Sequence, residues 1–381
     1  MVSLNEMEGI KPKQLKILQE NGINSIESLA MSIPESLAEI NGLSEKSARQ
    51  LVWKAREMLG MGTFKKVSEI QENFQYITTG SKNLDLILTP LNLREQNKLG
   101  GISTGRITEF FGPFKSGKTN ICHTLCVTTQ LSLKEGGLGG AVLYIDTENT
   151  FAKQKIERIS KRFGKDPNEI LSNIYHARIY SSDHQFQMIK ACEKAVQEKD
   201  VKLIIIDSLL ALLRSEYIGI GLLARRQQIL NQIIHELSRI AETYNIAIVV
   251  TNQVATVMKG TFSIEDAIGG NIMAHGCHFR ISLRSKGFSM NSSLERTATI
   301  CDAPDLPPET ATFFITEAGV SDTATVNYES SEYDQEQSSN EFELVAANEV
   351  DAESQIKEEE ELNTTPKSKS KKLVKSKVKA N

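Results

Sequence analysis

The residues with the clearest chemical meaning lie at positions 112–119, which read GPFKSGKT and match the phosphate-binding pattern GxxxxGK[ST]. In this pattern glycines open backbone N–H groups toward phosphates, the lysine reaches the β- and γ-phosphates, and the threonine hydroxyl binds Mg²⁺. A strand-like run, ITEFF, precedes the motif, and a helix-forming run, TNICHTLCVTTQ, follows it. The sequence therefore predicts a site for ATP and Mg²⁺ formed by Gly112, Pro113, Phe114, Lys115, Ser116, Gly117, Lys118 and Thr119.

Two carboxylates at the ends of apolar runs could complete this site. Asp207 closes the run LIIID and is the candidate for the magnesium shell, although an aspartate there could also simply cap a turn. Glu148 follows the run YIDT and is the candidate that orients or deprotonates the attacking water. Asp146 competes with it, but its place at the end of a strand favours a role as cap of the following turn.

These side chains need a scaffold that brings the ends of several strands together. From Thr78 to about Asp322, strand-like runs alternate with helical stretches, which predicts an α/β core with a mostly parallel sheet. The later runs lack intervening helices, so we expect them to form an antiparallel edge on the parallel core. The predicted strands are 107–111, 141–146, 174–180, 202–207, 246–251, 278–283, 297–301 and 312–316.

Three further segments flank the predicted core at 78–322. Residues 1–60 are expected to form a small helical domain. In it Gly42 occupies an apolar-x-Gly-apolar turn that resembles a DNA-binding helix-hairpin-helix, although a simple packing domain also meets the pattern. Residues 61–77 are interpreted as a linker, and residues 323–381 as a disordered, acidic-then-basic tail. The expected core of the helical domain is Leu15, Leu18, Leu29, Leu37 and Leu51.

Charge, hydrophobic runs and cysteine spacing bear on DNA binding, membrane insertion and metal or disulfide frameworks. The 381 residues carry a net charge of −4, but thirteen acidic residues and eight lysines from Glu329 onward account for −5, which leaves the rest near +1. The near-neutral part of the chain before Glu329 can still carry basic loops.

No apolar run approaches the roughly 20 residues that cross a bilayer, and the N-terminus lacks a secretory layout, so we expect a cytoplasmic protein. The five cysteines form no CxxC pair, which argues against a zinc finger or disulfide framework.

Several motifs in one order resemble those of the RecA-type recombinases, in particular the archaeal RadA proteins and their eukaryotic relatives. The motifs are GPFKSGKT, YIDTENTF, IIIDS and VVTNQVA, followed by IGGNIMAH and CDAPDLPPETATFFITEAGVSD. The resemblance implies a RecA-like P-loop ATPase core and a DNA-dependent ATPase that assembles filaments on single-stranded DNA. It also implies strand exchange with a homologous duplex, action at the nucleoid, rings in DNA-free states, and recombination mediators as partners.

The resemblance assigns roles outside the phosphate-binding motif. Gln253 matches a third catalytic residue, which senses the γ-phosphate and relays its presence to the DNA-binding loop that follows. His275 matches a second sensor at the subunit interface. Asp302 and Pro304 match a cap over the neighbouring subunit's nucleotide, and Lys155 takes the place of an arginine beside the adenine.

Two loops of the family contact DNA, and here they span about 214–226 and 254–268. The best candidates for phosphate contacts in them are Arg225, Arg226 and Lys259. For the arginine pair the alternative is a solvated helix start, although positive charge there opposes the helix dipole and so favours a nearby anion.

The sequence departs from the family pattern at several places. Ile220 replaces an arginine of the first loop, which removes one expected phosphate contact. Pro113 stands where an acidic residue is common, and residues 89–99 are an insertion. Phe64 resembles the aromatic residue that docks one subunit on the next, but Val67 replaces the alanine that normally follows three positions later.

Two rival functions stay open. An accessory paralogue would use the same ATP fold to load or stabilise the true recombinase, and Ile220 and Val67 would suit that role. The N-terminal domain argues against it, because reduced paralogues of the family often lack that domain. A ring-shaped DNA motor on the same core is the second rival. The lysines of the tail could contact DNA, compete for the basic loops, or only keep the tail solvated.

Overall fold

The computed structural model describes residues 2–325 apart from 65, 71–72, 260–261 and 287–293. The side chains of 257–259 and 262–264 are also outside the description. The predicted tail therefore lies outside the described residues from position 326 onward.

The N-terminal residues form a small helical domain, as expected. After a 3-10 turn at Leu4–Glu6, its helices are α1 (Pro12–Glu20), α2 (Ile26–Met31), α3 (Pro34–Ala38) and α4 (Glu45–Met58). Proline begins α1 and α3, where its missing N–H would have no helical partner anyway. Ser25 and Ser44 cap α2 and α4 by accepting a backbone N–H from the first turn. Of the expected core, Leu18, Leu29, Leu37 and Leu51 are buried, and Leu15 packs against them partly buried.

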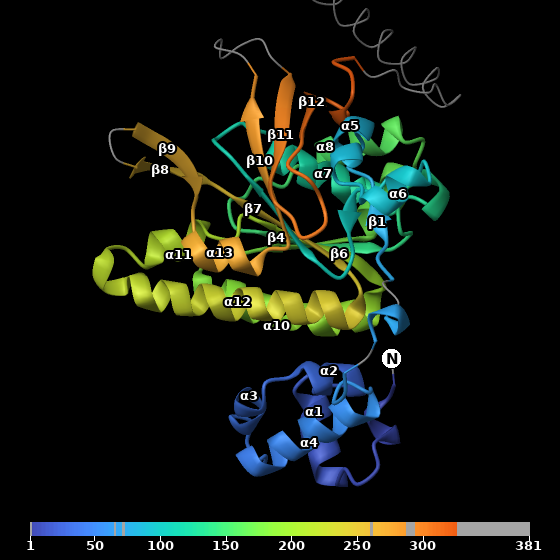
Figure 1. The fold of residues 1–381 in the computed structure, drawn as a ribbon, viewed down its shortest axis with the longest axis vertical. Coiled ribbons are helices and arrows are strands. Elements are labelled where there is room, and N and C mark those ends of the chain that lie inside the picture. The colour runs from blue at the N-terminus through green and yellow to red at the C-terminus, as the bar shows by residue number, and fades with distance from the viewer. Residues whose placement is uncertain (1, 65, 71–72, 260–261, 287–293, 326–381) are drawn as a thin grey trace, which may run out of the picture. The chain divides into compact units, whose positions relative to one another are not determined.

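A nine-stranded sheet forms the core of the following part, in the order β13-β12-β11-β10-β3-β7-β6-β4-β5 (Figure 1). The strands from β10 to β5 run parallel, whereas β11, β12 and β13 are antiparallel to their neighbours. The predicted antiparallel edge on a parallel core is thus confirmed. The strands are β3 (Ile107–Phe111), β4 (Ala141–Asp146), β5 (Ile174–Arg178), β6 (Val201–Asp207), β7 (Ala247–Asn252), β10 (Phe279–Ser285), β11 (Glu295–Asp302), β12 (Thr310–Thr316) and β13 (Gly319–Ser321).

Helices cover both faces of this sheet, so its central strands are apolar on both sides. In β4, Val142 and Tyr144 belong to the core on one face, and Leu143 and Ile145 to the core on the other. Figure 1 shows α10 and α12 running along the second face. The first face carries α5 (Lys82–Ile87), α7 (Lys118–Thr128), α8 (Lys153–Arg162) and α9 (Pro167–Ser172), and the second α10 (Ser182–Lys199), α11 (Ala211–Glu216), α12 (Leu223–Tyr244) and α13 (Gly270–Gly276).

Two further strand pairs are antiparallel and separate from the large sheet. Strands β1 (Tyr76–Ile77) and β2 (Ile102–Ser103) pair beside the core. Strands β8 (Val254–Lys259) and β9 (Phe262–Ala267) form a hairpin that projects from the sheet in Figure 1. The sequence indicated only a loop at 254–268, and that expectation was incomplete, because the runs VATVMK and FSIEDA are rich in residues that favour strands.

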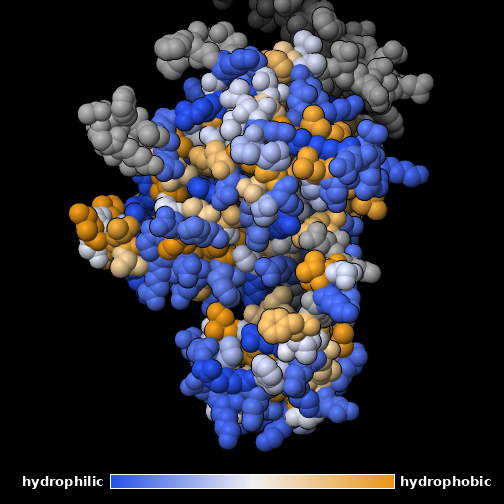
Figure 2. Space-filling model, in the orientation of Figure 1, coloured by the Kyte–Doolittle hydropathy of each residue, from blue (hydrophilic) through white to orange (hydrophobic). Residues whose placement is uncertain are grey.

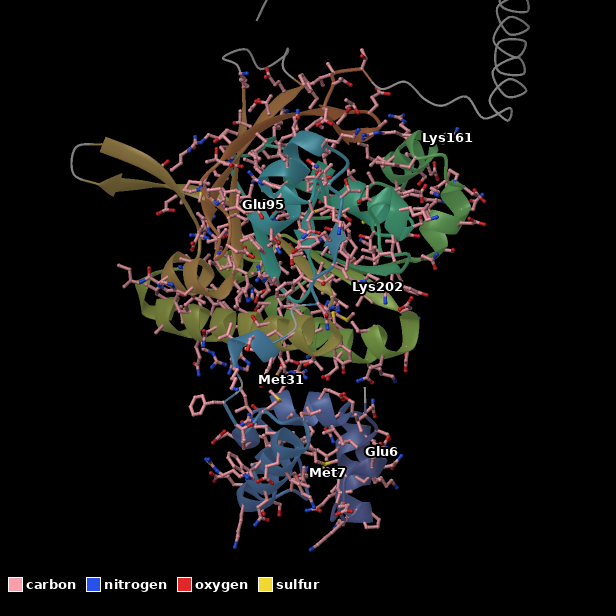
Figure 3. All side chains as sticks on the ribbon, turned by 45° about the vertical axis from the view of Figure 1, so that its right-hand side comes forward. Glu6, Met7, Met31, Glu95, Lys161 and Lys202 are labelled. Atoms are coloured by element: carbon pink, nitrogen blue, oxygen red, sulfur yellow. The ribbon has the colours of Figure 1, made fainter. Side chains whose placement is uncertain are left out.

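The insertion at 89–99 contains the short helix α6 (Leu91–Glu95). Its Arg94 guanidinium pairs with both carboxylate oxygens of Glu309, at 2.9 and 2.8 Å, and its Nε donates to the carbonyl of Thr89. Glu95, at the end of the helix, is exposed (Figure 3). The insertion is therefore tied to the segment before β12 by a bidentate ion pair. Single 3-10 turns complete the described elements at Val67–Glu69, Leu133–Glu135 and Ile220–Leu222.

Candidate nucleotide-binding site

The phosphate-binding motif forms the connection between β3 and α7. Lys115 and Gly117 have positive φ angles of 64° and 106°, and Gly117 is the N-cap of α7. Gly112 is also required, because a Cβ there would overlap the carbonyl of Leu283 on the neighbouring strand β10. The loop consequently wraps around the N-terminus of α7, where unpaired backbone N–H groups and the helix dipole favour a phosphate.

Lys118, the first residue of α7, turns its side chain back over the loop. Its Nζ lies 2.9 Å from the carbonyl oxygens of both Gly112 and Pro113. Burial lowers the pKa of this ammonium, and the negative charges of Asp207 and Glu148 partly oppose the shift. An ammonium group at a helix N-terminus is suited to binding phosphate.

One pocket joins the motif to the two carboxylates expected from the sequence. It brings together residues from the ends of β3, β4, β6 and β7, because the carboxyl ends of parallel strands meet at one edge of the sheet. The lining residues are Gly112, Pro113, Phe114, Lys115, Gly117, Lys118, Thr119, Asn120, Glu148, Thr150, Asp207, Gln253 and Val254.

Asp207 is held by hydrogen bonds from the two adjacent strands. The Tyr144 hydroxyl donates to its Oδ2 at 2.9 Å, and the Thr251 hydroxyl donates to its Oδ1 at 2.5 Å. The residue is buried, and it shares the pocket with Thr119. A hydroxyl and a carboxylate oxygen are ligands that Mg²⁺ accepts, so the donor set fits this ion.

Glu148 lies just beyond β4, and its carboxylate accepts two hydrogen bonds. The Ser208 hydroxyl donates to its Oε1 at 2.6 Å, and the side-chain amide of Gln253 donates to the same oxygen at 3.2 Å. Both partners directly follow strand ends, Ser208 after β6 and Gln253 after β7. The carboxylate thus faces the phosphate-binding loop from a fixed position at the edge of the sheet.

Asp146 takes a different role, as the sequence suggested. One of its oxygens accepts the backbone N–H groups of Glu148 and Asn149, at 3.1 and 2.6 Å, and the other accepts that of Phe151. Although burial opposes the change, these N–H groups hold the pKa of Asp146 below its usual value. Asp146 therefore shapes the turn that presents Glu148.

Four residues that the resemblance assigned to the nucleotide are not among the lining of this pocket. His275 is exposed on α13, and Asp302 and Pro304 are exposed at and after the end of β11. The Lys155 ammonium donates to the carbonyl of Thr316. The roles of His275, Asp302 and Pro304 at a subunit interface, and of Lys155 beside the adenine, stay predictions.

A polar network behind the pocket was missed from the sequence. The Asn252 amide donates to the Glu109 carboxylate at 2.7 Å and to the Ile268 carbonyl at 2.6 Å. Glu109, fully buried in β3, also pairs with Arg280 at 2.6 Å. A charged residue inside the run ITEFF was the available signal, because a buried carboxylate needs a partner. The network ties the end of β7 to the base of the β8–β9 hairpin.

The candidate DNA-binding residues lie in three separate segments of the chain. Arg225 and Arg226 are in the first turn of α12, where Arg225 is exposed. Lys259 ends β8, and its side chain lies outside the described residues. In the N-terminal domain, Gly42 has a φ of 98°, and a Cβ there would come 2.8 Å from the Cδ1 of Ile17, so only glycine fits this turn.

The predicted docking residues Phe64 and Val67 are both fully or largely exposed. A second pocket, mostly apolar, lies along β5, which is the edge strand of the sheet. Its apolar side chains come from β4, β5 and α10, namely Leu143, Ile145, Tyr175, Ala177, Met188, Ala191, Cys192 and Ala195. An open strand edge beside an apolar pocket can accept an extended segment that carries an aromatic side chain.

Comparison with known proteins places the chain in a family. The Rad51 family model matches residues 70–323, and the model of the SAM-like helix-hairpin-helix tandem matches residues 2–57. The chain is 41% identical over 329 residues to a DNA repair and recombination protein RadA of Cenarchaeum symbiosum (strain A), which covers 84% of this chain and 79% of the relative.

Two more relatives are similar over most of their length. A DNA repair protein RAD51 of Saccharomyces cerevisiae (strain ATCC 204508 / S288c) is 38% identical over 323 residues, 83% of this chain and 77% of the relative. A DNA repair and recombination protein RadA of Ignicoccus hospitalis (strain KIN4/I / DSM 18386 / JCM 14125) is 38% identical over 330 residues, 84% and 95% of the two chains. Within the described part of the chain, no helix is long and apolar enough to cross a membrane.

Proposed function

The chain belongs to the Rad51 family, and on that premise we propose that it is an ATP-dependent recombinase of DNA repair. It assembles filaments on single-stranded DNA and catalyses homologous pairing and strand exchange with a duplex, in the cytoplasm at the nucleoid. The observation that carries this proposal is the single pocket in which Lys118, Asp207, Glu148 and Gln253 meet at the base of the β8–β9 hairpin. Nucleotide and DNA sites that share a residue at their boundary can be coupled.

ATP and Mg²⁺ are the proposed ligands of the pocket. The N–H groups of the loop and the Lys118 ammonium would hold the phosphates, and the Thr119 hydroxyl and Asp207 carboxylate would hold Mg²⁺. Held by these two residues, Mg²⁺ would supply positive charge opposite the charge that develops on the phosphates. Glu148 accepts a proton from the attacking water, whose oxygen bonds to the γ-phosphorus while the bond from that phosphorus to the β-phosphate oxygen breaks and ADP leaves. The hydrogen bond from Ser208 keeps the Glu148 carboxylate in position.

Gln253 is proposed to sense the γ-phosphate and to relay its presence to the DNA-binding segment that follows, the β8–β9 hairpin. Its side chain touches Glu148, while its carbonyl accepts the N–H of Ile268 at 3.1 Å, where the hairpin returns. The side-chain amide of Asn252 also donates to the Ile268 carbonyl, which adds a second hydrogen bond at the base of the hairpin. A shift of the Gln253 side chain toward a γ-phosphate would therefore act directly on the backbone that begins and ends the hairpin.

Filament assembly is proposed to proceed through the linker. Phe64 of one subunit would enter the apolar pocket along β5 of the next, and Val67 would lie at its rim. Asp302, Pro304 and His275 would then face the neighbour's nucleotide, and Lys155 would lie beside its own adenine. Rings in the absence of DNA, and recombination mediators as partners, belong to the same proposal. The turn at Gly42 is proposed to bind DNA.

The deciding experiment is ATP-dependent strand exchange between a labelled single strand and its homologous duplex, with Lys118→Ala as the nucleotide control. We expect exchange by the natural protein and none by the variant. Binding of ATP and DNA without exchange, at saturating protein and low salt, would instead favour an accessory paralogue. Processive unwinding of a duplex would favour the DNA motor.

A further inference from the structure

The insertion at 89–99 leaves the core and returns to it at one place. The Thr89 hydroxyl donates to the carbonyl of Asp85 and accepts the backbone N–H of Gly100, both at 2.7 Å. Thr89 is fully buried, so these two hydrogen bonds close the base of the insertion. The elements before and after the insertion are thereby joined to each other independently of what the inserted residues contact.

Most of the insertion faces solvent. From position 91 to 99 every side chain is exposed except those of Leu93 and Arg94, which are half-buried. Figure 2 shows hydrophobic residues scattered among hydrophilic ones on the side of the core where α6 lies in Figure 1, and such scattered residues are ordinary on a protein surface. An insertion that buries so few side chains adds little to the core, so the contacts of Arg94 are its main connection to a distant segment.

Four hydrogen bonds hold the Arg94 guanidinium in one orientation. Nε donates to the Thr89 carbonyl at 2.9 Å, and Nη2 donates to the Ile87 carbonyl at 3.4 Å. The other two bonds go to the two carboxylate oxygens of Glu309, and they hold the pKa of Glu309 below its usual value. The two side chains are only 20% and 34% exposed, so water screens the ion pair in part. A bidentate pair of this kind fixes the geometry of both partners.

Glu309 belongs to the segment that carries the residues expected to cap a neighbour's nucleotide. We call residues 302–309, which run from the last residue of β11 to the residue before β12, the cap segment. Three of its residues are prolines, which lack a backbone donor. Among the described residues, none of 303–308 forms a backbone–backbone hydrogen bond. The position of the cap segment therefore depends on its side chains.

Three side chains fix the cap segment to the core. Leu306 is buried in the core on the α7 face of the sheet. On one side of it the Asp305 carboxylate accepts from the Arg106 guanidinium at 2.8 Å, and on the other side Glu309 accepts from Arg94. The first residues of the segment stay exposed. Two ion pairs on either side of a buried leucine thus hold a segment whose exposed part is free to contact another molecule.

We propose that Arg94 is a positioning residue of the nucleotide cap, and that through Glu309 it holds the cap segment in the conformation that contacts the nucleotide of the neighbouring subunit. A segment that is already ordered loses less conformational freedom when it closes on a ligand, so it binds more tightly. Arg94 raises the affinity for ATP in this way without contacting the nucleotide. The inference rests on the proposed function, from which it takes the cap and the filament, and it gives a role to residues that depart from the family pattern.

The place of Arg94 predicts a change in binding rather than in chemistry. Arg94 is not among the residues that line the nucleotide pocket, whereas Lys118 and Glu148 are. Loss of its ion pair should raise the KM for ATP in the DNA-bound filament and leave kcat unchanged, because an interaction made equally in the ground state and the transition state affects KM alone. A single subunit should bind ATP as before, since its own cap segment would serve the neighbour's nucleotide.

The test measures kcat and KM of ATP hydrolysis at saturating oligo(dT). The variants are Arg94→Gln and Glu309→Gln, and the matched control is Lys165→Gln, which removes an ammonium that lies 2.9 and 3.1 Å from the two carboxylate oxygens of Glu135. We expect KM to rise at least about fivefold in both variants, kcat to stay within about twofold, and the control to match the natural protein. Arg94→Lys should recover part of the affinity, because an ammonium can still pair with Glu309 but not in the bidentate geometry.

Two further comparisons test how Arg94 acts. The variant with both Arg94→Gln and Glu309→Gln should have a KM no higher than either single variant, because the two substitutions remove the same ion pair. In a Phe64→Ala background, at a dilution where sedimentation shows single subunits, Arg94→Gln should leave the dissociation constant of ATP unchanged. Thermal unfolding checks that each variant folds, and Glu309→Gln keeps the insertion's own hydrogen bonds, so it tests the claim if Arg94→Gln does not fold.

Three results would overturn the inference. An unchanged KM in the folded variants would show that the ion pair does not position the cap segment. Independent, multiplied increases in the variant with both substitutions would show that Arg94 does not act through Glu309. An equal loss of ATP affinity in single subunits would mean that the insertion supports the subunit's own site. If the natural protein itself hydrolysed no ATP on DNA, the proposed function would fail together with the inference, and this outcome is distinct because it does not involve the variants.

Discussion

The side-chain amide of Gln253 donates to the carboxylate of Glu148 across 3.2 Å, although 105 positions separate the two residues in the chain. The contact arises because Glu148 follows β4 and Gln253 follows β7, with β6 between these strands. It joins the residue proposed to activate water to the residue that begins the β8–β9 hairpin. Four expectations follow from this arrangement and its surroundings.

Glu148→Gln should abolish most hydrolysis while leaving nucleotide binding intact. The amide cannot accept a proton, but it keeps the size of the carboxylate and can still accept from Ser208. Loss of a general base costs about 10²–10⁴-fold in rate, so ATP turnover should fall by at least about 100-fold. Phosphate release measures this, and Glu169→Gln, at an exposed position of α9, is the control. A variant that turned over ATP within a few-fold of the natural rate would exclude Glu148 as the base.

Gln253→Ala should uncouple DNA from ATP. The substitution removes the contact to Glu148 but keeps the backbone bonds at the base of the hairpin. Couplings between sites are typically 1–3 kcal/mol, so stimulation of ATPase by single-stranded DNA should drop at least about fivefold while the DNA-free rate changes little. Gln187→Ala, at an exposed position of α10, serves as the control. If single-stranded DNA still stimulated the ATPase of the Gln253 variant fully, the Gln253 side chain would not couple the DNA site to the nucleotide site.

Phe64→Ala should weaken self-association. Burial of a phenylalanine side chain stabilises by about 1.5–3 kcal/mol, so the dissociation constant between subunits should rise at least about tenfold. Analytical ultracentrifugation without DNA measures the change, and Ile70→Ala, an exposed residue of the same linker, is the control. An equal loss of self-association in the Phe64 and Ile70 variants would mean that Phe64 makes no specific contact with the next subunit.

His123 should make stability depend on pH in the acidic range. Burial, chiefly, lowers the pKa of its imidazole to about 4, and its Nε2 accepts the backbone N–H of Ala152 at 3.2 Å. The unfolded chain binds this proton near pH 6.5, whereas the folded chain does not until pH 4, so stability falls as pH falls through this window.

We compare the unfolding free energy of the natural protein with that of His123→Gln at each pH. The difference between the two proteins should change by about 3 kcal/mol between pH 7 and pH 4. Asp85 works in the opposite direction, because burial raises its pKa to about 6 and stability falls as pH rises toward that value. It is present in both proteins, so its contribution cancels in the difference. A difference that is constant from pH 7 to pH 4 would contradict the assignment.

The sequence alone was sufficient to locate the phosphate-binding motif, to place Asp207 and Glu148 at or just beyond strand ends, and to predict the mixed character of the sheet. The chemical roles of the two carboxylates stay predictions. Lys118 and Thr119 lie in one contiguous pattern, and a carboxylate at the end of an apolar run stands out because such runs are buried. Patterns of this kind can be recognised in the sequence, because they depend on residues that are only a few positions apart.

The tertiary structure decided what these residues touch. The hydroxyls of Tyr144 and Thr251 fix Asp207 only because β4 and β7 lie on either side of β6, and strand order leaves no local pattern in the chain. The pocket along β5 likewise combines side chains from β4, β5 and α10. From the sequence Ile220 was only a missing arginine, whereas its 92% exposure makes it part of the protein surface. Exposure is set by every segment that packs nearby or fails to, so no short stretch of sequence contains it.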